Sequence, residues 1–136
     1  MYKWDPYLET GNETVDNQHK QCMVALNNLI DAIKQGKGKE EVIQTMNFLN
    51  DYTIMHFSEE EKLMKENNYT DYSTHKRYHD EFKIVVDDLA QRLVNEGPTW
   101  ELMNVVTFTF DDWLINHIKG EDFRMAAFVK TRAGTR

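Results

Sequence analysis

The feature that most constrains this chain is an apolar spacing of three and four residues that recurs in four separate segments. In the third segment the recurring positions are His75, His79, Phe82, Val86, Leu89 and Leu93. Such spacing places the side chains on one face of an α-helix, where they face a core. Short links between long helices of this kind favour antiparallel neighbours. The sequence therefore predicts an all-α, antiparallel up-down-up-down four-helix bundle with an N-terminal arm.

Helix-breaking and capping residues set the expected boundaries. We expect one domain over residues 1–136, with an arm over 1–13, four helices within 14–119, and an end segment and tail over 120–136. Asp16 is a good N-cap residue for the first helix, and Gly120 is expected to end the fourth. The four helices are expected to cover about residues 16–35, 40–65, 71–95 and 100–119.

The arm is expected to lack regular structure, because Pro6 and Gly11 interrupt it. Its large apolar side chains can cover one end of the bundle. These side chains are Trp4, Tyr7 and Leu8.

Composition limits the partners of this chain. The net charge of −7 argues against a nucleic-acid partner, because phosphate contact requires a basic face. The single cysteine, Cys22, excludes an intrachain disulfide. No signal-peptide pattern and no apolar run of about 20 residues occurs, so we expect a cytoplasmic protein with no membrane partner.

The histidines carry most of the functional information. Each of the four predicted helices has histidine on its inward stripe, and the antiparallel order brings all of them to the same end of the bundle. Taken singly, a histidine on such a stripe is more simply a buried or solvated polar residue. Together they form one layer, which favours a metal site. The five positions are His19, His56, His75, His79 and His117.

Five imidazoles exceed the needs of one ordinary metal site. Imidazole combined with carboxylate suits iron, manganese or zinc, and two ions close together need bridging carboxylates. Glu60 is the first candidate bridge, one helical turn beyond His56. Asp122 is the second, five residues after His117, where Gly120 is expected to loosen the helix end. Glu59 and Glu61 are expected to face solvent.

The chain resembles the hemerythrin family over nearly its whole length, and its arm and length resemble the bacterial branch, bacteriohemerythrin. The motifs that carry the resemblance are Trp4, Thr10-Gly11-Asn12, 15–19 (VDNQH), 56–61 (HFSEEE), 75–79 (HKRYH) and 113–122 (WLINHIKGED).

The resemblance implies a metal centre with seven protein ligands. It implies two irons bridged by Glu60, Asp122 and an oxo or hydroxo group. It assigns His75, His79 and His117 to a six-coordinate iron. His19 and His56 then belong to an iron with one open position, where dioxygen binds.

The function that this implies is reversible dioxygen binding, for carriage, storage or delivery, rather than enzyme activity. The chain lacks the paired Glu-x-x-His motif of di-iron oxygenases. A dry apolar wall beside the open iron should slow proton delivery. Its expected members are Cys22, Phe57, Trp113, Leu114 and Ile118.

Two other functions remain open from the sequence. The domain can sense oxygen or redox state for a separate signalling partner protein. Alternatively, it can act as a di-iron enzyme that handles peroxide or nitric oxide.

Overall fold

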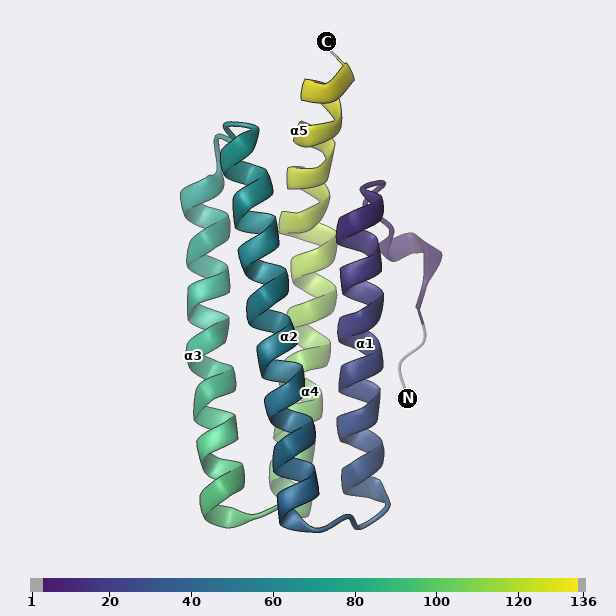
Figure 1. Ribbon diagram of the computed structural model, residues 1–136, viewed down its shortest axis with the longest axis vertical. Helices are drawn as coiled ribbons and strands as arrows, with labels where there is room; N and C mark the ends of the chain where they lie inside the picture. Colours follow the sequence, from purple (N-terminus) through teal and green to yellow (C-terminus); the bar gives the residue numbers. More distant parts are fainter. Residues whose placement is uncertain (1–3, 135–136) are drawn as a thin grey trace.

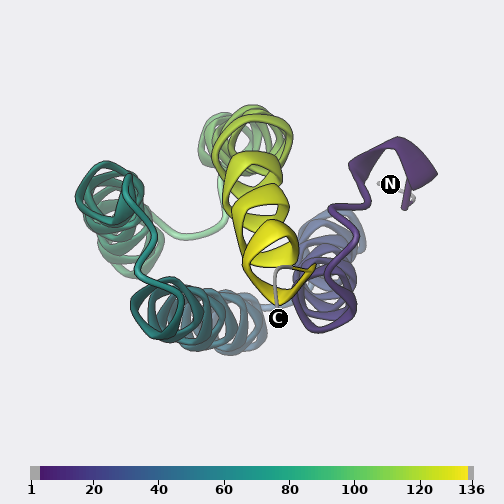
Figure 2. The same ribbon diagram turned by 90° about the horizontal axis from the view of Figure 1, so that it is seen from above.

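Four long antiparallel helices stand side by side in the computed structural model, which describes residues 4–134, with side chains described through residue 131 (Figure 1). The predicted all-α four-helix bundle is confirmed. The helices are α1 (Glu13–Lys34), α2 (Lys39–Glu66), α3 (Tyr72–Glu96) and α4 (Trp100–His117). Seen along the bundle axis, they surround a central core (Figure 2). None of the described helices combines the length and apolar character needed to cross a membrane.

The core is built from the inward stripes of all four helices. Burial of these apolar side chains supplies the main driving force for packing the helices together. Each helix contributes side chains that are at most 4% exposed, among them Leu29, Leu49, Val86 and Val106. The histidines continue the same stripes toward the end of the bundle where α1 begins and α2 ends.

The first helix begins three residues earlier than predicted, and Asp16 is not its N-cap. Asn12 takes that role, because its side chain accepts a hydrogen bond from the backbone N–H of Val15 at 3.1 Å. The Asp16 carboxylate is buried and accepts hydrogen bonds from the backbone N–H and hydroxyl of Thr10, at 2.9 and 2.8 Å. Asp16 therefore fastens the arm to α1.

The arm lies along the side of the bundle, beside α1 (Figure 1). Contrary to the prediction, it contains regular structure, the short 3-10 helix η1 (Pro6–Leu8). Leu8 is buried against Met23 and Ile118, whereas Tyr7 is 83% exposed. The predicted covering role is therefore wrong for Tyr7, and the arm covers a flank of the bundle rather than its end.

The predicted helix end at Gly120 is wrong. The backbone continues from α4 through a π-helical turn, η2 (Ile118–Asp122), into α5 (Phe123–Gly134). α5 leans across the end of the bundle (Figure 2), and its Met125 packs with Val15, Met64 and Tyr69. Most of the predicted tail is therefore a closing helix. Residues 1–3 of the predicted arm and residues 135–136 of the predicted tail lie outside the described residues.

Candidate metal centre

The structure brings together all seven residues predicted as metal ligands. They come from α1, α2, α3, α4 and η2, and each is at most 6% exposed. The role of these residues as ligands stays a prediction. The seven are His19, His56, Glu60, His75, His79, His117 and Asp122.

The π-helical turn places Asp122. In an uninterrupted α-helix, residues five apart point about 140° away from each other. A π-helical turn closes at five residues instead, so it returns Asp122 to the face that carries His117. Asp122 Oδ1 then lies 3.1 Å from His117 Nε2.

The seven candidate ligands form one layer across the bundle, and three imidazoles converge on one side of it. Nε2 of His117 lies 3.1 Å from Nε2 of His79 and 3.1 Å from Nε2 of His75. Nitrogens bound about 2.1 Å from one metal, at right angles, lie about 3.0 Å apart. The observed spacing therefore fits adjacent corners of a single coordination sphere. Glu60 and Asp122 complete this five-residue group.

The other side of the layer holds a four-residue group. His19 Nε2 lies 2.9 Å from Asp122 Oδ2, and His56 Nε2 lies 3.1 Å from Glu60 Oε1. Glu60 and Asp122 belong to this group as well as to the first. The two carboxylates therefore stand between the groups, as bridging ligands of two ions would.

Buried polar atoms without partners support a cation at this place. Within the described part of the chain, all four carboxylate oxygens of Glu60 and Asp122 are buried, and no residue outside the seven candidate ligands donates a hydrogen bond to them. Of the two buried ring nitrogens of His19, Nε2 faces Asp122, and Nδ1 has no hydrogen-bonding partner among the described residues. Leaving so many buried polar atoms unpaired is costly, and metal coordination would satisfy the inward-facing ones. The residues present therefore fit a metal centre.

The electrostatics of the layer point the same way. Burial and the adjacent Asp122 raise the pKa of Glu60 well above its ordinary value. Burial alone would also raise the pKa of Asp122, but the neighbouring imidazoles, His117 first, hold it well below its ordinary value. Burial lowers the pKa of His56 to about 4 and also lowers that of His79, so both rings stay neutral, as metal ligands must.

Two further residues orient the candidate ligands. His56 Nδ1–H donates to Gln18 Oε1 at 2.7 Å, and His79 Nδ1–H donates to Glu61 Oε2 at 3.0 Å. Each bond turns Nε2 toward the layer, the usual arrangement for a metal-binding histidine. The prediction that Glu61 faces solvent is wrong, whereas Glu59 is exposed as predicted.

Sequence reasoning missed Gln18 and Glu61 as orienting residues. Each is next to a ligand in sequence, at a position that looks outward from its own helix. The partner histidine comes from another helix, so only the packing of the bundle reveals the contact.

The predicted oxygen pocket corresponds in part to a small enclosed cavity of about 10 Å³. Cys22, Phe57, Trp113 and Leu114 line it, and so does His56 of the four-residue group. Burial, with smaller effects of Glu60 and Asp122, raises the pKa of Cys22 to about 12, so its thiol stays neutral.

Ile118 does not line this cavity. It is fully buried in a separate cluster with Leu8 and Met23. Ile118 directly follows His117, so its side chain points about 100° away from the ligand face, and like Leu114 it packs on the cluster beneath the arm.

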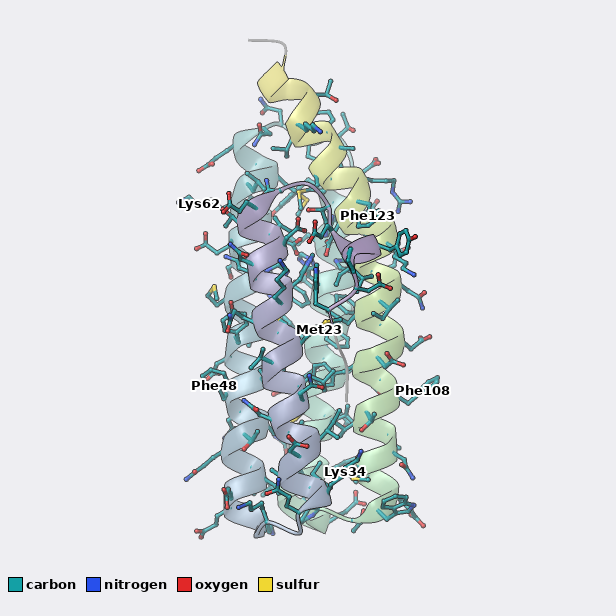
Figure 3. The ribbon with its side chains drawn as sticks, turned by 90° about the vertical axis from the view of Figure 1, so that its right-hand side faces the viewer. Met23, Lys34, Phe48, Lys62, Phe108 and Phe123 are labelled. Atoms are coloured by element: carbon teal, nitrogen blue, oxygen red, sulfur yellow. The ribbon has the colours of Figure 1, made fainter. Side chains whose placement is uncertain are left out.

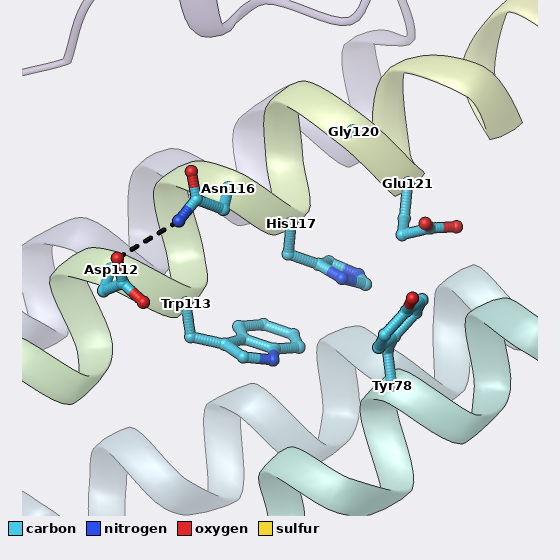
Figure 4. Close-up of a pocket in the computed structure, with 7 residues that line it drawn as sticks. All are labelled: Tyr78, Asp112, Trp113, Asn116, His117, Gly120 and Glu121. Carbon is cyan, nitrogen blue, oxygen red and sulfur yellow. Dashed lines mark hydrogen bonds between the residues drawn. The ribbon is translucent and has the colours of Figure 1, made fainter.

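A wider cleft of about 270 Å³ opens between α3 and α4, where Trp113, His117 and Tyr78 line it (Figure 4). The indole of Trp113 stacks on the ring of His117, with centroids 4.2 Å apart and planes 12° apart. This stack covers one face of the ring of a candidate ligand.

Fold and site together define a four-helix-bundle protein with a buried histidine–carboxylate cluster able to bind metal. The chain belongs to the hemerythrin family: the family model described as "Hemerythrin HHE cation binding domain" matches residues 10–129.

Relatives and solved structures agree with this assignment. The chain is 35% identical over 120 residues to a bacteriohemerythrin of Pseudomonas aeruginosa, covering 88% of this chain and 75% of that protein. It is 32% identical over 123 residues to a hemerythrin-like protein of Naegleria gruberi, covering 90% and 89%. A crystal structure of wild-type hemerythrin superimposes with a TM-score of 0.82 at 28% identity, covering 95% of this chain and 98% of that one.

Proposed function

We propose that this protein binds dioxygen reversibly at a pair of iron ions held in the buried layer. The observation that carries the proposal is the unequal division of the ligands. One group offers three imidazoles and two carboxylates, whereas the other offers two imidazoles and the same two carboxylates. With one further bridging oxygen, the three-imidazole group would supply six ligands to its ion, whereas the two-imidazole group would supply five and leave one position for dioxygen.

The residues that would hold the ions follow from the two groups. His75, His79 and His117 would hold the saturated ion, and His19 and His56 the open one. Glu60 and Asp122 would bridge them, together with an oxo or hydroxo group. When bound, the two ferrous ions supply the electrons that dioxygen accepts and returns on release.

The protein's own side chains would keep this binding reversible. The cavity beside His56 is lined by Phe57, Trp113 and Leu114, which have no acidic proton to donate. Cys22 is the one thiol there, and its high pKa keeps it protonated. An apolar wall of this kind excludes water and slows proton leakage, which supports carriage or storage of dioxygen rather than turnover.

The experiment that tests the proposal combines metal analysis with optical spectroscopy. We expect two irons per chain and a visible spectrum that appears with oxygen and disappears under argon over repeated cycles. One zinc per chain, or no metal after expression with ample iron, would contradict the metal assignment. Rapid consumption of peroxide or nitric oxide by the wild-type protein would instead favour an enzyme.

A further inference from the structure

The metal layer is sealed from most directions, so an ion needs a route to reach it. Glu60 and Asp122 are at most 1% exposed. One cleft, of about 180 Å³, lies between the amino-terminal end of α1 and the carboxyl-terminal end of α2 and includes Glu60 in its wall. Figure 3 labels Lys62, another residue of this wall, near the upper end of α2.

The wall of this cleft changes from exposed to buried as it approaches the layer. Glu59, Lys62 and Glu66 are exposed, whereas Glu60 is buried. Gln18 also lines the cleft, and its side-chain oxygen holds the candidate ligand His56. The cleft therefore runs from solvent to a carboxylate of the metal layer.

Glu60 is the observation that points to a cation. It lines the cleft, it is 1% exposed, and within the described residues none outside the candidate ligands donates a hydrogen bond to its oxygens. The mouth of the cleft carries two exposed carboxylates, Glu59 and Glu66, against one ammonium group, Lys62, and Glu60 lies deeper. An excess of one charge sign in a cleft raises the local concentration of the opposite ion and speeds its entry.

The cleft beside His117 attracts a cation less strongly. Its two carboxylates already have partners, because Asp112 accepts a hydrogen bond from Asn116 and Glu121 pairs with Arg124. Its walls are otherwise largely aromatic.

We propose that the cleft between α1 and α2 is the entry route for a divalent cation, in which Glu59 and Glu66 attract the ion and Glu60 receives it. This inference rests on the proposed metal centre. A charge at the mouth of a route stabilises the ion during passage in both directions. It therefore changes the rates of loading and release together and leaves the final occupancy unchanged.

The test measures the rate at which the metal-free full chain takes up ferrous ion under anaerobic conditions, and the rate at which the loaded protein releases it to a chelator. We expect Glu59→Gln and Glu66→Gln each to slow both rates about threefold, and the double variant about tenfold, within the range that such charge effects span. Lys62→Gln should speed both rates. Added salt should slow the wild type more than the double variant.

Matched controls separate this route from general charge effects. Glu40→Gln removes an exposed charge from the far end of α2, and Asp112→Asn removes one from the cleft beside His117. Neither should change the rates. The proposal is overturned if the Glu59 and Glu66 variants load like the wild type, or if Asp112→Asn slows loading instead. Failure of the wild type to hold two irons would count against the metal centre itself, and so the two failures are distinct.

Discussion

Oε2 of Glu61 lies 3.0 Å from Nδ1 of His79, so the outward nitrogen of one candidate ligand faces an anionic partner. The matching nitrogen of His56 faces the neutral amide oxygen of Gln18. The two groups of the layer thus differ in the charge behind one of their imidazoles, in addition to the number of imidazoles they contain. A carboxylate behind a ligating histidine fixes the ring and makes it a stronger donor.

Glu61→Gln should weaken iron binding about tenfold to a hundredfold, the usual effect of removing such a partner. Equilibrium competition with a chelator measures it. Glu59→Gln is the matched control, because Glu59 is the exposed neighbour on the other side of Glu60. Its equilibrium affinity should equal that of the wild type. Equal affinities for all three proteins would show that the Glu61–His79 contact does not tune the ligand.

Glu60→Gln should abolish the binding of two irons yet stabilise the metal-free protein at pH 7. The reason is that burial and Asp122 disfavour the charged form of Glu60 when no cation is present. We expect its melting temperature to rise by at least about 4 °C, the shift that roughly 1 kcal/mol produces in a domain of this size. Calorimetry of both metal-free proteins provides the measurement. A lower melting temperature would mean that Glu60 makes a stabilising contact without metal.

The metal-free protein should lose stability as the pH falls from about 6.5 to about 4.5. Folded His56 and His79 have lowered pKa values, so in this range the unfolded chain binds up to two protons that the folded imidazoles do not. Glu60 acts in the opposite sense, because its folded pKa is raised and it holds a proton that the unfolded chain releases. Because two histidines oppose one glutamic acid, the net slope keeps the sign set by the histidines and is at most about 1.4 kcal/mol per pH unit.

Urea unfolding across this pH range measures that slope. In Glu60→Gln the opposing contribution is gone, so the slope should be steeper, up to roughly 2.7 kcal/mol per pH unit. Identical slopes for the two proteins would contradict the raised pKa of Glu60.

Leu114→Ala should shorten the lifetime of the oxygenated form at least about threefold, equivalent to roughly 0.6 kcal/mol of barrier. Leu114 lines the cavity beside His56, and a smaller side chain would admit water and protons. Decay of the visible spectrum measures the lifetime, with iron content checked in parallel. Leu29→Ala is the control, since Leu29 is fully buried but lines no part of this cavity. It should cost about 2–5 kcal/mol of stability and leave the lifetime unchanged.

Much of the bundle and the convergence of the histidines could be predicted from spacing alone. His75 and His79 lie on the same stripe as Phe82 and Val86, and a stripe that faces a core also fixes where its polar members point. Antiparallel order then brings His19 and the end of α2 to the same depth. These are properties of single helices and of their order along the chain.

The remainder depends on features that helical periodicity does not contain. The continuation beyond Gly120 follows from a π-helical turn, whose five-residue hydrogen bonding leaves no clear mark in the sequence. The role of Asp16 depends on Thr10, which lies outside the helix. In both cases the contact joins two residues that do not lie on the same predicted helical stripe.

The π-helical turn has a consequence for the closing helix. Each residue of an α-helix advances about 100° around the axis, so the extra residue in this turn rotates all of α5 by about that angle. That rotation is what directs Met125 toward Val15 and Met64. The π-helical turn therefore determines both which face of α5 packs on the bundle and the direction in which the Asp122 carboxylate points. A substitution that converted the turn to regular α-helix would displace both α5 and the Asp122 carboxylate, even though it changed none of the seven candidate ligands.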